Sequence, residues 1–86
     1  MKTAYYPGFP APDGRRIARI EHYAARLEDL GAECWLYVGG GATLDVRIAP
    51  DTPPLRLAAD APLPVALTAA RVAAQILGHL AACPTA

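Results

Sequence analysis

Hydrophobic and polar residues alternate along two short segments, Glu33–Val38 and Thr43–Ile48, on either side of three consecutive glycines. Because successive side chains of a strand point to opposite faces, this alternation predicts a β-hairpin with Gly39-Gly40-Gly41 as its turn. The apolar positions share one face and are expected in the core: Cys34, Leu36, Val38, Leu44, Val46 and Ile48. The opposite face carries Trp35 and Tyr37, which is unusual for a face that meets water.

Apolar residues at helical spacing predict a first helix from Asp13 to about Leu30. Asp13 is a typical N-cap residue, and Gly31 suits the left-handed conformation that often follows a helix. The residues expected to be buried are Ile17, Ile20, Ala24 and Leu27. The opposite side of the helix carries a narrow basic stripe of Arg15, Arg19, His22 and Arg26.

A second helix is expected from Pro64 to Ala82, with apolar residues around most of its circumference. The stripe expected to face the core is Val65, Ala69, Val72, Ile76 and Leu80. A further flank is rich in alanine and consists of Ala66, Ala70, Ala73, Ala74, Leu77 and Ala81. We expect this flank to form the interface of a homodimer, because small residues allow a close approach of two backbones. The alternative is a monomer in which the first helix covers it.

Alternation resumes at Leu55–Ala58 and predicts a short third strand at a sheet edge, where the neighbouring prolines are tolerated. Leu55 and Leu57 should join the core face, and Arg56 should join the opposite face. Residues 1–12 contain three aromatic residues and three prolines, which predicts an extended N-terminal arm. We expect this arm to dock on the domain, and the alternative is a flexible recognition segment.

The resulting order of elements predicts a small α+β domain over residues 13–86, with two helices on one face of a three-stranded antiparallel sheet. This order, helix-strand-strand-strand-helix, resembles that of the double-stranded RNA-binding domain over roughly residues 13–82. That family contacts phosphates through a lysine-rich start of its last helix. Residues 64–71 carry one basic residue, Arg71, so the resemblance concerns topology and implies no RNA-binding residue.

Charge and composition narrow the classes of function. Eight basic and eight acidic residues give a formal net charge of zero, whereas strong non-specific nucleic-acid binders usually carry a basic excess. The 86 residues are 53% hydrophobic, which predicts one small folded core. No signal peptide or membrane-spanning apolar run is evident, so we expect a cytoplasmic protein without a membrane partner.

Residues suited to catalysis are sparse. The chain contains two cysteines, two histidines and no serine, with no CxxC motif and no Cys/His cluster. We therefore expect no metal, no cofactor and no enzymatic activity. A pair of Cys34 with His79 is conceivable, yet no third group is placed to orient it. The three glycines precede a strand instead of a helix, which argues against a phosphate-binding loop.

The expected partner-binding residues are Trp35 and Tyr37 with Arg47 and Arg56 on the same face, since Trp, Tyr and Arg are enriched in interface hot spots. Arg15, Arg19 and Arg26 are a second expected contact, suited to an acidic protein surface. The alternatives are that the arm covers the two aromatic residues as a minor core and that the arginines are simply solvated.

These observations suggest a small non-catalytic protein-binding module that acts by occupying the surface of another protein. By analogy of size and Ala- and Arg-rich composition, we expect an inhibitor of host machinery encoded by a phage or mobile element, such as an anti-CRISPR protein. The alternative is a nucleic-acid-binding regulator that uses the Trp35/Tyr37 face, where bases could stack, or the arginine stripe.

Overall fold

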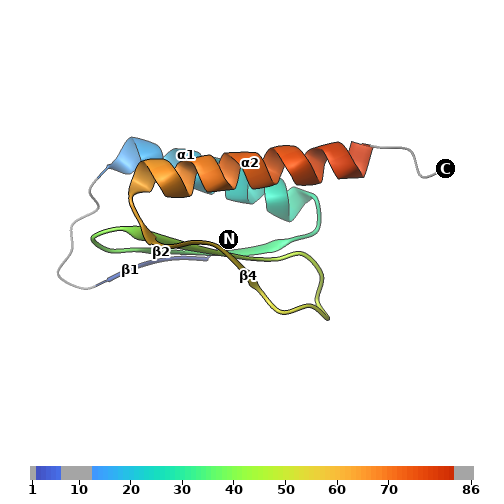
Figure 1. The fold of residues 1–86 in the computed structure, drawn as a ribbon, viewed down its shortest axis with the longest axis horizontal. Helices are drawn as coiled ribbons and strands as arrows, with labels where there is room; N and C mark the ends of the chain where they lie inside the picture. The colour runs from blue at the N-terminus through green and yellow to red at the C-terminus, as the bar shows by residue number, and fades with distance from the viewer. Residues whose placement is uncertain (1, 7–12, 83–86) are drawn as a thin grey trace.

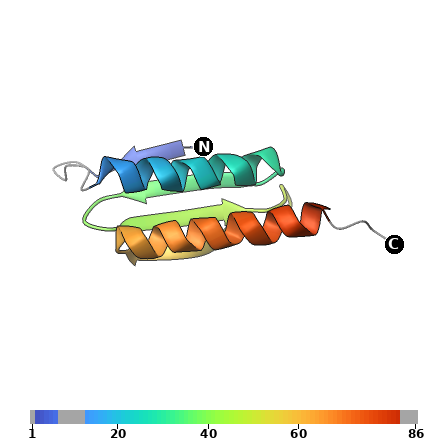
Figure 2. The ribbon, with the colours of Figure 1, turned by 90° about the horizontal axis from the view of Figure 1, so that it is seen from above.

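A computed structural model of the chain describes residues 2–6 and 13–82. Its elements follow one another along the chain as β1 (Lys2–Tyr5), α1 (Gly14–Asp29), β2 (Glu33–Val38), β3 (Ala42–Arg47), β4 (Leu55–Ala61) and α2 (Leu63–Ala82). The two helices lie side by side on one face of a single sheet (Figures 1 and 2). The α+β class and the placement of both helices on one face are as predicted.

The sheet has four strands in the order β1-β2-β3-β4, so the prediction of a three-stranded antiparallel sheet is wrong in this respect. β1 pairs in parallel with β2, whereas β2–β3 and β3–β4 are antiparallel. The strand belongs to the predicted N-terminal arm, which therefore docks at the sheet edge in its described part. The Tyr6 N–H donates to the Val38 carbonyl at 2.8 Å, and the Thr3 hydroxyl donates to Glu21 of α1 at 3.0 Å. Phe9 and the prolines of the arm lie outside the described residues.

The termini of α1 agree with the sequence signals. The Asp13 carboxylate accepts hydrogen bonds from the backbone N–H groups of Arg15 and Arg16 at 3.1 and 3.2 Å. These bonds satisfy two of the donors that the first helical turn leaves free. Gly31 has a φ of 101°, the left-handed conformation expected after the helix. The predicted residues Ile17, Ile20, Ala24 and Leu27 are all buried.

The glycine-rich turn between β2 and β3 is tightly packed. A Cβ atom at Gly41 would lie 2.7 Å from the Ala61 carbonyl oxygen, and one at Gly39 would lie 2.6 Å from the Tyr6 ring. Gly41 is therefore required because the β4 backbone approaches the turn there, and Gly39 leaves room for the Tyr6 ring.

β4 is longer than predicted and forms the second edge of the sheet. Its pairing with β3 contains two register shifts, which give this edge an irregular path. Leu57 packs against the core as expected. Leu55 and Ile48 were expected in the core, yet they are 51% and 50% exposed. Both line a hollow with Thr52 and Pro53 at the base of the β3–β4 connection, apart from the main core.

The largest difference from the sequence prediction concerns the orientation of α2 about its axis. Ala66, Ala70 and Ala74 are 0%, 0% and 5% exposed and belong to the core. The large aliphatic residues expected there are 41–63% exposed, namely Val65, Val72, Ile76 and Leu80. Small side chains face the core because α2 packs closely on both α1 and the sheet.

The prediction that the alanine-rich flank of α2 forms a homodimer interface is therefore wrong. Ala66, Ala70 and Ala74 are covered within a single chain, and Ala73 and Leu77 pack partly against the same core. Ala81 alone in this set is exposed among the described residues of α2. The flank therefore is not free for a second copy, because α1, as in the alternative, covers it together with the sheet.

α2 is also notable for its apolar character. By length and composition alone it could cross a membrane, with a mean hydropathy of 1.4 over an 18-residue window of which 17% is buried. The prediction that no apolar segment is long enough to cross a membrane is therefore wrong for α2. Core helices of soluble proteins that pass the same test are mostly buried, whereas α2 packs on α1, β3 and β4 through one side only.

Candidate functional site: the open sheet face

The face of the sheet opposite the helices carries the predicted aromatic residues. Trp35 lies beside Lys2 of β1 and Asp45 of β3, and Tyr37 lies beside Thr43 of β3. The alternate residues of β2 are buried under the helices. Trp35 and Tyr37 are half-buried on their own side, as the alternation predicts. We call this surface the open sheet face and define it by Tyr6, Trp35, Tyr37, Asp45, Arg47 and Arg56.

Trp35 is covered in part by Arg47 of the neighbouring strand. The guanidinium carbon lies 5.6 Å from the centre of the indole ring, within the range of a cation–π contact. The Arg47 Nη2 atom also donates to Glu33 Oε1 at 2.6 Å. Arg47 Nε is buried and has no hydrogen-bond partner among the described residues. The side chain is thus held over Trp35 by a carboxylate at one end.

Arg56 is held in a similar way at the edge of the face. Its Nε and Nη2 atoms donate to the two oxygens of Asp45 at 2.9 and 3.4 Å. This bidentate hydrogen bond and the charge of Asp45 raise the pKa of Arg56 above its ordinary value. The face therefore presents its predicted arginines as ion pairs with carboxylates and not as free cations.

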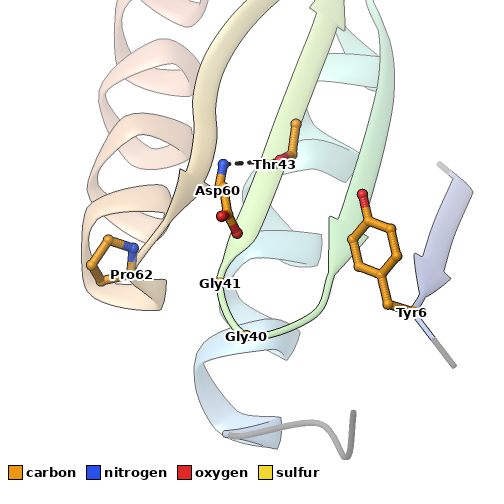
Figure 3. A pocket seen from close by; sticks show the side chains of 6 residues that line it. All are labelled: Tyr6, Gly40, Gly41, Thr43, Asp60 and Pro62. Carbon is orange, nitrogen blue, oxygen red and sulfur yellow. Dashed lines mark hydrogen bonds between the residues drawn. The ribbon is translucent and has the colours of Figure 1, made fainter. Parts of the chain in front are cut away.

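Tyr6 joins this face, although no sequence pattern predicts it there. Since Tyr5 pairs with Val38 on the helix side, Tyr6 points to the same side as Trp35 and Tyr37. Its ring lies beside the glycine turn (Figure 3). A prediction of β1 as a strand would have placed Tyr6 on the open sheet face. However, a segment of four residues is too short to show the alternation of a strand.

A pocket of about 660 Å³ lies at this end of the sheet, between Tyr6 and Asp60 (Figure 3). Gly40, Gly41 and Pro62 also line it, together with Thr43. The Asp60 N–H donates to Thr43 Oγ1 at 3.0 Å, while Asp60 adopts a φ of 46°. Aspartate tolerates this left-handed conformation better than most residues. The pocket extends the open sheet face toward the β2–β3 turn.

The basic stripe of α1 lies on the opposite side of the molecule. Arg15, Arg19 and Arg26 are exposed on the helix side, away from the buried face of α1. None of the three forms a salt bridge with a described residue. The structure therefore does not bring the two predicted sets of binding residues together, because the sheet and the helix layer separate them.

Cys34 is not placed as a nucleophile. Its side chain is buried under α1, and its thiol lies 3.7 Å from the Ala24 carbonyl oxygen as a weak donor. Burial, and secondly the charge of Glu28, raise the pKa of Cys34 from 9.0 to about 11. The group is therefore a neutral thiol at physiological pH, whereas cysteine chemistry requires the thiolate.

This shift predicts a loss of stability in alkaline solution. The folded state keeps the Cys34 proton to a higher pH than the unfolded state, so the stabilisation is complete below pH 9 and is lost as the pH rises toward 11. We expect this group to lower the free energy of unfolding by about 2 kcal/mol between pH 8 and 11. Urea titrations at several pH values should show a smaller decrease in Cys34→Ala than in the wild type. Equal decreases would contradict the prediction.

The described part of the chain offers few other groups suited to chemistry. Over residues 2–6 and 13–82, no group of three or more His, Cys, Asp or Glu side chains could hold a metal ion. His22 lies edge-on to Tyr23, with ring centres 5.5 Å apart, in a groove between the two helices.

Comparisons with known proteins identify no relative. No family model matches the sequence, and no curated protein or solved structure is significantly similar to it.

Proposed function

We propose that this protein is a small non-catalytic module that binds another protein through its open sheet face. The observation that supports this proposal is the set of three aromatic side chains, Tyr6, Trp35 and Tyr37, on a sheet face that no described helix covers. Aromatic residues supply large contact areas with few rotatable bonds, and they dominate interface hot spots. Arg47 and Glu33 flank Trp35 and would form part of the polar rim.

The charges of this face favour a protein partner over a nucleic acid. The cationic side chains are Lys2, Arg47 and Arg56, and the anionic side chains on or beside the same face are Glu33, Asp45 and Asp60. Binding to phosphates depends on free cations and releases counterions. Since the two arginines already have carboxylate partners, phosphate contacts would have to displace existing ion pairs.

The basic stripe of α1 is proposed as a separate contact. Arg15, Arg19 and Arg26 would attract an acidic surface and raise the rate of association. Because they lie on the helix side, only a partner that wraps around the domain, or a second partner, could use them together with Trp35. The narrower proposal, an inhibitor of host machinery such as an anti-CRISPR protein, requires that the partner be a component of that machinery.

Affinity capture tests the proposal. The immobilised protein is incubated with lysate of the source organism, with and without nuclease, and bound proteins are identified by mass spectrometry. We expect a partner that survives nuclease and is retained as salt rises from about 50 to 200 mM, since an aromatic interface depends less on salt than phosphate contacts do. The double variant Trp35→Ala/Tyr37→Ala should lose this partner.

Two further variants serve as comparisons in the same capture. Gln75→Ala changes an exposed residue of α2 and should bind as the wild type does. Replacement of Arg15, Arg19 and Arg26 by glutamate should slow association with an acidic partner and leave the fold intact. A partner lost on nuclease treatment or on a modest increase in salt would favour the nucleic-acid-binding regulator instead.

A further inference from the structure

α2 carries a continuous row of aliphatic side chains on its exposed side. Val65, Val72, Ile76 and Leu80 are 54%, 41%, 56% and 63% exposed, and Ala69 lies between them. Their spacing of three or four residues places them on one face of the helix. We call this row the outer α2 stripe. Exposed apolar clusters of this kind are uncommon on soluble monomers and usually mark contact surfaces.

The outer α2 stripe points away from α1. On the opposite side of α2, Gly78 lies near Leu30 of α1, and Gln75 shares a groove with His22 of α1. α2 packs over β3 and β4, at the β4 edge of the sheet (Figure 2). The stripe therefore forms a lateral surface above an edge strand, and no described residue covers it.

We propose that this surface binds a second copy of the chain, with the two α2 helices packed antiparallel about a two-fold axis near Val72. Reversal of the stripe places Val65 opposite Leu80 and Ala69 opposite Ile76. Ala69, the small residue of the row, then faces the larger Ile76 on both sides of the axis, as in well-packed layers that interdigitate. A two-fold interface requires such a self-complementary surface.

The available area is sufficient for a dimer of moderate affinity. The 20 residues of α2 span about 30 Å, and one helix is about 10 Å wide. The β4 edge lies roughly 10 Å below α2, so the lateral surface is about 20 Å high. Its length of about 30 Å then gives a footprint of about 600 Å² on each subunit. The total of about 1,200 Å² is at the lower limit of stable interfaces. We therefore expect a dimer that dissociates on dilution.

The charges on α2 favour a second copy over a lipid surface. The helix has no acidic residue, one histidine, His79, in its last turn, and one arginine, Arg71, which lies on the side away from the stripe. The antiparallel contact therefore brings no like charges together. Helices that lie in a membrane interface usually carry several basic residues on their polar face, and α2 does not.

The outer α2 stripe is a separate surface from the open sheet face of the proposed function. The outer α2 stripe belongs to the helix layer, whereas Trp35 and Tyr37 lie on the far side of the sheet. A dimer could therefore present two open sheet faces to two copies of a partner, and failure of either proposal leaves the other standing.

Light scattering and sedimentation equilibrium over a wide range of protein concentration test the dimer. Ile76→Glu should raise the dissociation constant on the order of 100-fold or more, because it places a carboxylate in the contact. Gln75→Glu is the matched control, since it adds the same charge on the neighbouring side of the helix and should leave the constant nearly unchanged. Circular dichroism should show both variants folded.

Cysteine cross-linking tests the antiparallel geometry in a Cys83→Ser background. Val72→Cys should form an intermolecular disulfide with itself, and a mixture of Val65→Cys with Leu80→Cys should cross-link more readily than either alone. A wild-type mass of one chain at all concentrations would overturn the proposal, as would a dimer unaffected by Ile76→Glu. Binding of the monomer to phosphatidylcholine or phosphatidylglycerol vesicles, abolished by Ile76→Glu, would assign the stripe to lipid instead.

Discussion

Replacement of Ala70 by glutamate is expected to destabilise the protein strongly, whereas the same replacement of Ile76 should leave its stability nearly unchanged. Ala70 is 0% exposed and sits in the core beneath α2, so a carboxylate there would be buried without a partner. The cost is expected to be about 3–5 kcal/mol or more. A domain of this size is stabilised by only about 4–13 kcal/mol. Ile76 is 56% exposed, and its glutamate would reach water.

Circular dichroism and urea denaturation of the two variants measure this difference. Glutamate is nearly as good a helix former as alanine, so intrinsic helix propensity contributes little at position 70. The result would be reversed if the large aliphatic residues of α2 faced the core. A folded Ala70→Glu variant together with an unfolded Ile76→Glu variant would therefore contradict the orientation of α2 described above.

Replacement of Trp35 by alanine is expected to weaken binding of the protein partner by about 30-fold or more, which corresponds to a hot-spot loss of about 2 kcal/mol. The change removes the indole ring and the cation–π contact with Arg47 but leaves the buried side of β2 intact. We therefore expect a much smaller effect on the free energy of unfolding than on affinity.

Calorimetric titration of the captured partner with wild type and variant measures the affinity, and urea denaturation measures the stability. Trp35→Phe, which keeps an aromatic ring, should lose less affinity than Trp35→Ala. Leu36→Ala is a useful contrast, because Leu36 is 0% exposed and its truncation should reduce stability by about 2–5 kcal/mol. An unchanged affinity in Trp35→Ala would remove the open sheet face from the proposed interface.

Much of the fold could be predicted because its signals are local. The alternation of Glu33–Val38 shows which side of the strand is buried, and the Asp13 and Gly31 signals give the two ends of α1. In α1 one face is polar and the other apolar, and in β2 the aliphatic residues Leu36 and Val38 share one side, so the period also gives the orientation. Trp35 and Tyr37 could be placed on the open side for the same reason.

The helical period of α2 is clear, but both of the faces that could be buried are apolar. The period alone therefore could not show which face lies in the core. Side-chain size favours Ile76 and Leu80 as core residues, whereas the close approach of α1 and the sheet favours Ala70 and Ala74. That distance is a tertiary property, and it cannot be read from α2 alone.

β1 and the ion pairs of the site could not be predicted for a related reason. β1 has four residues and is defined by its parallel pairing with β2, a partner distant in sequence. Without β1, Tyr6 could not be placed on the open sheet face. The predicted arginines are correctly placed there, but their pairing with Glu33 and Asp45 depends on the cross-strand register.

The most direct test of the central claim uses Trp35 as a probe, since the chain contains one tryptophan. Incorporation of 5-fluorotryptophan gives a single ¹⁹F resonance that reports on the open sheet face, even in a mixture with unlabelled proteins. Addition of the captured partner should shift or broaden this resonance and reduce its sensitivity to a soluble paramagnetic probe. A resonance that stays unchanged while the labelled protein is shown to be bound would contradict the account, because the partner would then occupy another surface.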